Sequence, residues 1–293
     1  MKEFQYFKPE NLSEAISLSA EFVSNYALLA GGTDLIVQMK RGIKSPSCLI
    51  NLKGISELNY INFNRGEGLS IGPLITHNAL GKHPIILEKY PLLAEAAQSI
   101  GTYQIREQGT IGGNICNGSP AADTIPSLMC LGAKLKLQSS GKNTVTAVED
   151  FFEGPQKTKL GPGEILTEIQ IPPLVPNTGG EYMKLGVRRA LEIAIVGVAA
   201  LIALDKAKQT CLRAKIVLAS VAPIPLPCRK AEAVLVGEKM EAKIIDQAAH
   251  VAQEEAIPIT DVRGTAEYRR EMVYILTKRA LNQALKRAIE RDI

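Results

Sequence analysis

Two glycine pairs, far apart in the chain, constrain the fold more than any other feature. The first lies in Leu28-Leu-Ala-Gly-Gly-Thr-Asp-Leu35, directly after an apolar run, and the second lies near the start of Thr110-Ile-Gly-Gly-Asn-Ile-Cys-Asn-Gly-Ser-Pro-Ala-Ala-Asp123. Glycine lets the backbone approach a ligand closely because no Cβ intervenes, and backbone N–H groups bind phosphate. One glycine pair after a strand is more often only a turn. Two such loops that also carry hydroxyl, amide and carboxylate side chains favour one site for a large phosphorylated cofactor.

The usual nucleotide-binding and hydrolase motifs are absent from the sequence. No G-x-G-x-x-G occurs, so a Rossmann dinucleotide site lacks its fingerprint. The glycines at 113 and 118 have the spacing of a P-loop, but Ser119 and Pro120 follow where lysine and serine or threonine are required. No G-x-S-x-G elbow is present either. The sequence therefore gives no support to NTPase or hydrolase chemistry.

Composition disfavours several further classes of protein. The net charge of the 293 residues is only +4, and the basic residues are scattered except near the C-terminal end, so we expect no nucleic-acid partner. Neither the five cysteines nor the three histidines show metal-ligand spacing, and we expect no metal on this chain. The first residues do not resemble a secretory signal, and the longest apolar run, residues 193–204, is too short to span a bilayer. We expect a cytoplasmic protein without a membrane span.

Apolar periodicity predicts a βαβ-like unit at the N-terminal end and a mixed region after it. In the first unit we expect a short strand around Phe4 to Tyr6, a helix capped by Asn11 or Ser13, and two strands, Tyr26–Ala30 and Cys48–Leu52, with a short helix between them at Asp34–Lys40. The mixed region from residue 58 contains a predicted hairpin with glycines 66 and 68 in its turn, helices near residues 76 and 91, the long glycine loop of residues 110–123, and strands over 133–138 and 164–171.

A proline- and glycine-rich stretch, residues 172–180, predicts a connection to a third region. Three runs rich in β-branched residues follow it and are expected to form one antiparallel sheet: residues 181–187, 193–204 and 211–221. The rest is predicted to be helical, over residues 231–235, 241–257 and 266–290. The basic residues of the last helix, Arg269 and Arg270 among them, are expected to form a solvated face, the alternative being that they meet an acidic partner or a neighbouring domain.

Three ordered segments resemble those of a known family. Ala30-Gly-Gly-Thr-Asp34, Thr110-Ile-Gly-Gly-Asn114 and Ser119-Pro-Ala-Ala-Asp123 are similar to the FAD-binding medium subunit of the molybdenum hydroxylases, the group of xanthine dehydrogenase, carbon monoxide dehydrogenase and nicotinate dehydrogenase. The resemblance extends over nearly the whole chain and includes Lys184 to Arg189 and Ala266 to Arg270. It implies an α+β fold. An FAD-binding fold of the vanillyl-alcohol-oxidase (PCMH) type would occupy two subdomains, residues 1–55 and 56–175, and residues 176–293 would form an antiparallel sheet with a helical bundle.

The resemblance also implies a site. Gly31, Gly32 and Thr33 would lie closest to the FAD diphosphate, Asp123 would bind the ribityl or adenosine side, and Lys184 would lie near the flavin, unless it is a solvated surface lysine. Ile100 stands where the family often has an aromatic residue. Neither a catalytic residue nor a metal ligand is implied on this chain. The implied cofactor-binding residues are Leu29, Ala30, Gly31, Gly32, Thr33, Asp34, Leu35, Thr110, Ile111, Gly112, Gly113, Asn114, Asp123, Leu166 and Lys184.

The function implied is that of an oxidoreductase subunit that relays electrons. FAD on this chain would receive electrons from a small [2Fe-2S] subunit, which is supplied by a large molybdopterin subunit, and an external acceptor such as NAD, a quinone or oxygen would remove them. Two alternative functions remain compatible with the sequence. One is a self-contained flavin reductase of the same fold that acts on its own small substrate, and the other is an assembly protein that has kept the fold without the cofactor.

Overall fold

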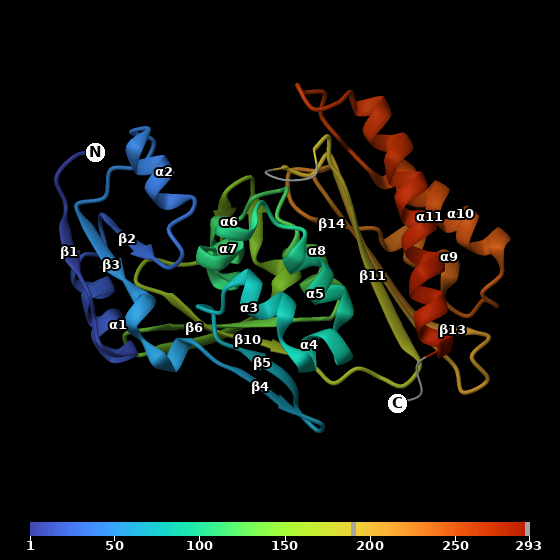
Figure 1. Ribbon diagram of the computed structural model, residues 1–293, viewed down its shortest axis with the longest axis horizontal. Coiled ribbons are helices and arrows are strands. Elements are labelled where there is room, and N and C mark those ends of the chain that lie inside the picture. The colour runs from blue at the N-terminus through green and yellow to red at the C-terminus, as the bar shows by residue number, and fades with distance from the viewer. Residues whose placement is uncertain (189–191, 291–293) are drawn as a thin grey trace.

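The computed structural model describes residues 1–188 and 192–290, which form three units arranged side by side (Figure 1). The N-terminal unit is built on a three-stranded parallel sheet with the order β1-β3-β2, and its central strand β3 is buried along its whole length. The side chain of Asn11 accepts a hydrogen bond from the N–H of Glu14, so the predicted cap of the first helix is confirmed. The elements are β1 (Gln5–Phe7), α1 (Leu12–Glu21), β2 (Tyr26–Leu29), α2 (Leu35–Lys40) and β3 (Cys48–Asn51).

The middle unit is a five-stranded antiparallel sheet, ordered β4-β5-β10-β6-β7, with helices packed on one face (Figure 1). The predicted hairpin is present as β4 and β5, and a small second hairpin is formed by β8 and β9. Its strands are β4 (Ile61–Asn64), β5 (Gly68–Ile71), β6 (Lys134–Ser139), β7 (Lys142–Ala147), β8 (Phe152–Gly154), β9 (Lys157–Thr158) and β10 (Ile165–Ile171). Its helices are α3 (His77–Lys82), α4 (Pro84–Lys89), α5 (Pro91–Gln98), α6 (Tyr103–Gln108), α7 (Ile111–Asn117) and α8 (Thr124–Cys130).

The C-terminal unit contains the predicted antiparallel sheet, and that sheet is covered on both faces. All nine residues of β12 are buried. Ala199 and Leu201 pack into the core of the middle unit, whereas Val198, Ala200 and Ile202, which point to the opposite face, pack against the C-terminal helices. The elements are β11 (Thr178–Leu185), β12 (Val196–Leu204), β13 (Cys211–Ala219), β14 (Leu226–Pro227), α9 (Arg229–Leu235), α10 (Ala242–Glu255) and α11 (Ala266–Glu290).

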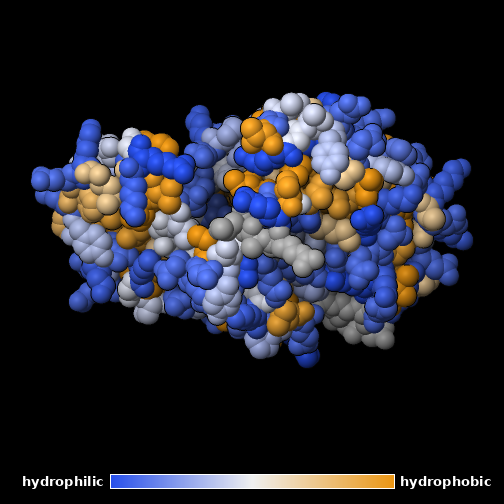
Figure 2. All heavy atoms as spheres, turned by 45° about the horizontal axis from the view of Figure 1, so that its top comes forward, coloured by the Kyte–Doolittle hydropathy of each residue, from blue (hydrophilic) through white to orange (hydrophobic). Residues whose placement is uncertain are grey.

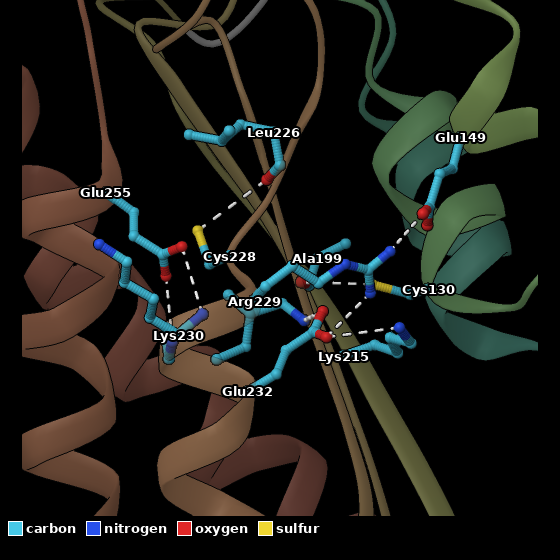
Figure 3. A network of polar contacts seen from close by, with 12 residues as sticks. Cys130, Glu149, Ala199, Lys215, Leu226, Cys228, Arg229, Lys230, Glu232 and Glu255 are labelled. Carbon is cyan, nitrogen blue, oxygen red and sulfur yellow. Dashed lines mark hydrogen bonds and ion pairs between the residues drawn. The ribbon is translucent and has the colours of Figure 1, made fainter.

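Polar contacts add to the apolar packing between the middle and C-terminal units (Figure 3). Arg229, at the start of α9, forms ion pairs with Glu149 of the middle unit and with Glu232. Glu232 also accepts a hydrogen bond from Lys215 Nζ at 3.3 Å and one from the backbone N–H of Ile216 at 3.1 Å. The thiol of Cys130, in α8, donates to the carbonyl oxygen of Ala199. The two units are therefore held together by hydrogen bonds as well as by a shared core.

The structure corrects the sequence-based expectations for residues 111–117 and for Arg269, and it adds helices α4 and α6 and strand β7, which were not predicted. Residues 111–117 form helix α7 instead of an extended loop, because the Thr110 hydroxyl caps its first turn by accepting from the Gly113 N–H at 3.1 Å. Arg269 is only 1% exposed, so the expectation of a solvated face is wrong for this residue. Its guanidinium donates to the carbonyl oxygens of Ile195 and Ser220 and to Asp261. Arg189 lies outside the described residues. Within those residues, no helix is long and apolar enough to cross a membrane.

Candidate cofactor site

A cavity of about 620 Å³ lies between the N-terminal and middle units. Figure 2 shows the molecule hollowed between the lobe at its left, which contains the N-terminal unit, and the rest of the chain. The walls come from the end of β2 and the start of α2 on one side, and from residues 73–77, 100–117 and 160–166 on the other. Ligand pockets commonly have about 300–1,000 Å³, so the cavity has room for a cofactor of dinucleotide size.

The two glycine segments meet in this cavity, as the sequence predicted, and they also touch each other. A Cβ added to Gly31 would lie 2.2 Å from the carbonyl oxygen of Gln108 and 2.8 Å from Cα of Gly109. No side chain fits at that distance. Gly31 is therefore needed for the close packing of the first loop on the residues that precede the second segment.

The other glycines serve different purposes. Gly32 has a φ of +77°, in the left-handed region that favours glycine. Gly112 is packed against Pro73, because an added Cβ would lie 2.4 Å from the proline Cβ. At Gly113 the nearest atoms would be the Thr110 hydroxyl at 3.0 Å and the Ala30 Cβ at 3.8 Å. Of these glycines in the cavity wall, Gly113 is the least hindered, because an added Cβ there would meet no atom closer than 3.0 Å.

The backbone N–H groups of the two segments differ in their availability. In the second segment they are already used: Ile111 donates to Ile75 O at 3.0 Å, Gly112 to Pro73 O at 2.9 Å, and Asn114 to Thr110 O at 2.9 Å. In the first segment, the N–H groups of residues 31–34 donate to no acceptor within the described part of the chain. The unpaired backbone donors for an anion in the cavity are therefore in the first segment. Successive free N–H groups of this kind are a typical binding site for phosphate.

Several side chains of the middle unit complete the wall. Asn114 is oriented by Thr124, whose hydroxyl donates to the Asn114 side-chain oxygen at 2.7 Å, so that the amide nitrogen is left as a donor. Leu166, at the start of β10, adds apolar surface. Burial raises the pKa of the Cys116 thiol to about 12, so this thiol stays protonated at neutral pH and serves as a packing residue.

Asp123 and Lys184 bind each other instead of lining the cavity. Lys184 Nζ lies 2.9 Å from Asp123 Oδ2 and also donates to Ser99 O at 3.0 Å, and the Tyr182 hydroxyl donates to Asp123 Oδ1 at 2.7 Å. Burial raises the pKa of Asp123, whereas the ammonium of Lys184 and the two hydrogen bonds act in the opposite direction. The pair joins the residue before α8 to strand β11 of the C-terminal sheet. Ile100, the neighbour of Ser99, lines the cavity.

The structure thus brings together most, but not all, of the residues implied by the sequence. Those that line the cavity are Ala30, Gly31, Gly32, Thr33, Asp34, Leu35, Thr110, Gly112, Gly113, Asn114 and Leu166. Leu29, Ile111, Asp123 and Lys184 do not line it, and Ile111 is fully buried in the core of the middle unit. Sequence reasoning missed Gln38 and His77, whose side chains carry unpartnered polar atoms in the wall. Neither stands in a motif, so the sequence contained no signal for them.

The chemistry of this wall suits a phosphorylated cofactor. Unpaired backbone donors, the Thr33 hydroxyl and the Asn114 amide can bind phosphate and sugar oxygens, and the apolar residues can cover a ring system. Among the described residues, no three His, Cys, Asp or Glu side chains come together as a metal site would require. The wall is therefore suited to hold a cofactor mainly through the backbone and neutral polar groups.

Two family models together match almost the whole chain. Residues 2–174 match the FAD binding domain in molybdopterin dehydrogenase, and residues 181–284 match the CO dehydrogenase flavoprotein C-terminal domain. Among curated proteins, the carbon monoxide dehydrogenase medium chain of Afipia carboxidovorans is 34% identical, over 97% of this chain and 98% of the relative. The glyceraldehyde dehydrogenase medium chain of Sulfolobus acidocaldarius is also 34% identical, over 96% and 98%.

Solved structures agree with these matches. A chain of carbon monoxide dehydrogenase from Hydrogenophaga pseudoflava superposes with a TM-score of 0.93 at 33% identity, and 98% of each chain is covered. A chain of quinoline 2-oxidoreductase from Pseudomonas putida 86 superposes with a TM-score of 0.90 at 27% identity, over 99% of this chain and 100% of that one. The likeness therefore includes all three units.

Proposed function

Because this chain belongs to the FAD-binding medium subunits of the molybdenum hydroxylases, the family of carbon monoxide dehydrogenase and xanthine dehydrogenase, we propose that its 620 Å³ cavity is the FAD site. The chain is an oxidoreductase flavoprotein subunit, and the family and α+β fold expected from the sequence are confirmed. The observation that carries the proposal is the meeting of both glycine segments in one cavity, where the N–H groups of residues 31–34 have no acceptor within the described chain.

The residues divide into three roles toward FAD. The N–H groups and hydroxyl of Gly31, Gly32 and Thr33 bind the diphosphate, and Gly113 leaves the space that the cofactor needs. Asn114 donates through its amide, oriented by Thr124. The remaining residues that shape the wall are Ala30, Asp34, Leu35, Thr110, Gly112 and Leu166, whereas Leu29 and Ile111 lie behind it and support it. Bound FAD supplies the redox chemistry, accepting electrons singly and releasing them in pairs.

Asp123 and Lys184 act together in this proposal. Their ion pair fixes the backbone at Ser99, next to the wall residue Ile100, and it holds one partly buried ammonium group behind that part of the wall. Such a cation stabilises negative charge on a reduced cofactor, because charges interact more strongly where water is excluded. We assign the three units to residues 1–55, 56–175 and 176–293, with FAD between the first two.

The electrons pass through partner chains in this proposal. A [2Fe-2S] subunit delivers them to this chain from a molybdopterin subunit, and an acceptor such as NAD, a quinone or oxygen removes them. The organic substrate is selected by the large partner subunit and not by this chain. This is supported by two relatives with the same 34% identity, which belong to a carbon monoxide dehydrogenase and to a glyceraldehyde dehydrogenase.

The proposal is tested by purifying the protein together with whatever chains accompany it. We expect a yellow preparation that releases one FAD per medium chain on denaturation, together with iron–sulfur and molybdenum subunits. A colourless chain that takes up no FAD would contradict the cofactor site. A yellow chain that purifies alone, and whose flavin is reduced by NADH or NADPH and reoxidised by a small substrate, would instead establish a self-contained reductase.

A further inference from the structure

His77 is a buried side chain in the cavity wall with no assigned partner. It is the first residue of α3 and only 2% exposed, yet it lines the cavity. Its Nδ1 is buried without a hydrogen-bond partner, and no bond to either ring nitrogen is present in the described part of the chain. Nδ1 is itself shielded from the cavity, so the ring nitrogen that can reach a ligand there is Nε2, which has no partner among the described residues and is not buried. Polar groups of side chains as buried as this one nearly always have a partner, so an unbonded nitrogen at a ligand site points to a bond made with the ligand.

The imidazole lies where the two glycine segments meet. The backbone N–H of His77 donates to Gly109 O at 3.0 Å, which fixes the start of α3 on the residue before Thr110. A Cβ built on Gly109 would lie 3.3 Å from Cδ2 of His77 and 3.6 Å from the Thr33 hydroxyl. The ring is therefore close to the loop whose N–H groups have no acceptor in the described chain.

Arg106, whose charge acts on this ring, forms its hydrogen bonds with other residues and none with the imidazole. Arg106, in α6, donates through Nε to Asn78 Oδ1 at 3.1 Å and through its guanidinium to Ile100 O at 2.8 Å. Burial, together with the positive charge of Arg106, lowers the pKa of His77 to about 4. The ring is thus neutral near pH 7 and carries one N–H donor.

We propose that His77 binds FAD, donating a hydrogen bond from its neutral imidazole to the diphosphate. This inference rests on the proposed FAD site and adds a residue that neither glycine motif contains. A hydrogen bond to an anionic oxygen is among the stronger ones in proteins, and a buried donor left unpaired is costly. His77 is a positioning residue for the cofactor and takes no part in proton transfer.

The test compares His77→Leu with the full-length wild type, both stripped of flavin and titrated with FAD. We expect FAD to bind about 10- to 100-fold more weakly to the variant, the factor that corresponds to loss of one charge-assisted bond. Titration with riboflavin, which lacks the diphosphate, should give the same affinity for both proteins. His77→Gln and His77→Asn place an amide near Nε2 and Nδ1 respectively, and the one that restores FAD affinity identifies the donating nitrogen.

His83→Leu is the matched control, because His83 also has an unpartnered Nδ1 but does not line the cavity. Its FAD affinity should equal that of the wild type. Wild-type FAD affinity in His77→Leu would overturn the inference, and equal losses for FAD and riboflavin would overturn the assignment to the diphosphate. A wild-type chain that binds neither flavin would overturn the proposed site itself. If His77→Leu does not fold, the contrast between the Gln and Asn variants decides the question.

Discussion

At Gly31 an added Cβ would lie 2.2 Å from the carbonyl oxygen of Gln108, just before the other glycine segment, whereas at Gly113 the nearest atom would be the Thr110 hydroxyl at 3.0 Å. These two glycines look alike in the sequence, and both stand in a pair before a polar residue. Their surroundings give them opposite roles, because one keeps the two segments in contact and the other leaves room for a ligand. Substitutions at the two positions should therefore have different consequences for folding and for FAD binding.

Gly113→Val should abolish tight FAD binding while the chain remains folded. Its branched side chain would enter the space beside Ala30, and such overpacking costs about 1–3 kcal/mol, equivalent to roughly 10- to 100-fold in affinity. The measurement is flavin content after purification, with the unfolding temperature of the apo-protein as the check on folding. Gly154→Val is the control, since a Cβ there meets nothing within 4 Å among the described residues. Normal flavin occupancy in Gly113→Val would contradict the assignment of this space to FAD.

Gly31→Ala should lower both stability and FAD affinity. The added methyl group would force the first loop away from Gln108 and Gly109, at a cost of about 1–3 kcal/mol of folding free energy. Urea unfolding of the apo-protein should therefore show a lower midpoint for Gly31→Ala than for Gly113→Val. The same midpoint for both variants would show that the contact between the two segments is not needed for the fold.

Helix α11 illustrates what periodicity leaves open at the scale of an element. Its length was predicted correctly from apolar spacing, but its basic residues differ in how far they are exposed and in what they contact. Arg279 is exposed, whereas Arg287 makes ion pairs with Glu95 of α5 at 2.6 Å and with Glu181 of β11 at 2.7 Å.

Burial and the nearby Glu95 raise the pKa of Glu181 to about 7, and Arg287 opposes this rise. The folded chain therefore binds more protons than the unfolded chain between about pH 4.5 and 7, and the contribution of Glu181 to stability falls as the pH rises through that window.

Arg287→Leu should destabilise the chain more at pH 8 than at pH 5. Without the guanidinium, Glu181 faces Glu95 with no cation between them, and ionising Glu181 at the higher pH becomes more costly. We expect a loss of about 1–3 kcal/mol at pH 8, reduced from the value for fully buried pairs because these groups are partly exposed. Urea unfolding at both pH values measures the difference. Arg279→Leu, on the exposed side of the same helix, should change stability equally little at both. A loss at Arg287 that does not depend on pH would argue against this account.

For the molecule as a whole, the C-terminal sheet is the part that connects the cofactor cavity with the helices beyond it. Because both faces of β12 are buried, the middle unit and the C-terminal helices pack on the same strand. Three ion pairs cross this boundary among the described residues: Arg229 with Glu149, Arg287 with Glu95, and Lys184 with Asp123. The last is the least exposed, since Asp123 is 5% exposed and lies 2.9 Å from Lys184 Nζ, so the docking of the units depends in part on this pair.

Lys184→Met should destabilise the chain by about 2–4 kcal/mol, because it leaves a carboxylate buried without its cation. Asp123→Asn combined with Lys184→Met should recover most of that loss, and Lys286→Met, at an exposed position, should cost nothing measurable. Chemical unfolding measures stability, and the reduction potential of bound FAD tests the role of the ammonium. An unchanged potential in Lys184→Met would restrict Lys184 to a structural role.

Much of the fold could be predicted from the sequence because the signals are local. Apolar patterning marked strands in each of the three larger sheets, although it missed β7 and β14, and Asn11 marked the start of α1. Helix α7 was missed because two glycines in its first turn normally disfavour helix, a preference that Thr110 and the packing of Gly112 on Pro73 override. The glycine segments of the site were also visible as motifs. His77 was not, since its importance depends on which residues surround it in space.

The sequence by itself determined the family, much of the order of the elements and the two glycine segments of the proposed cofactor site, since each depends on residues that are neighbours in the chain. The tertiary structure decided how those loops are used. It showed that the N–H groups of Ile111 to Asn114 are already bonded, that those of residues 31–34 are not within the described chain, and that Asp123 is paired with Lys184. The physical reason is that hydrogen bonding and burial depend on contacts between distant segments, such as Gly31 with Gln108 and His77 with Gly109, which no local pattern encodes.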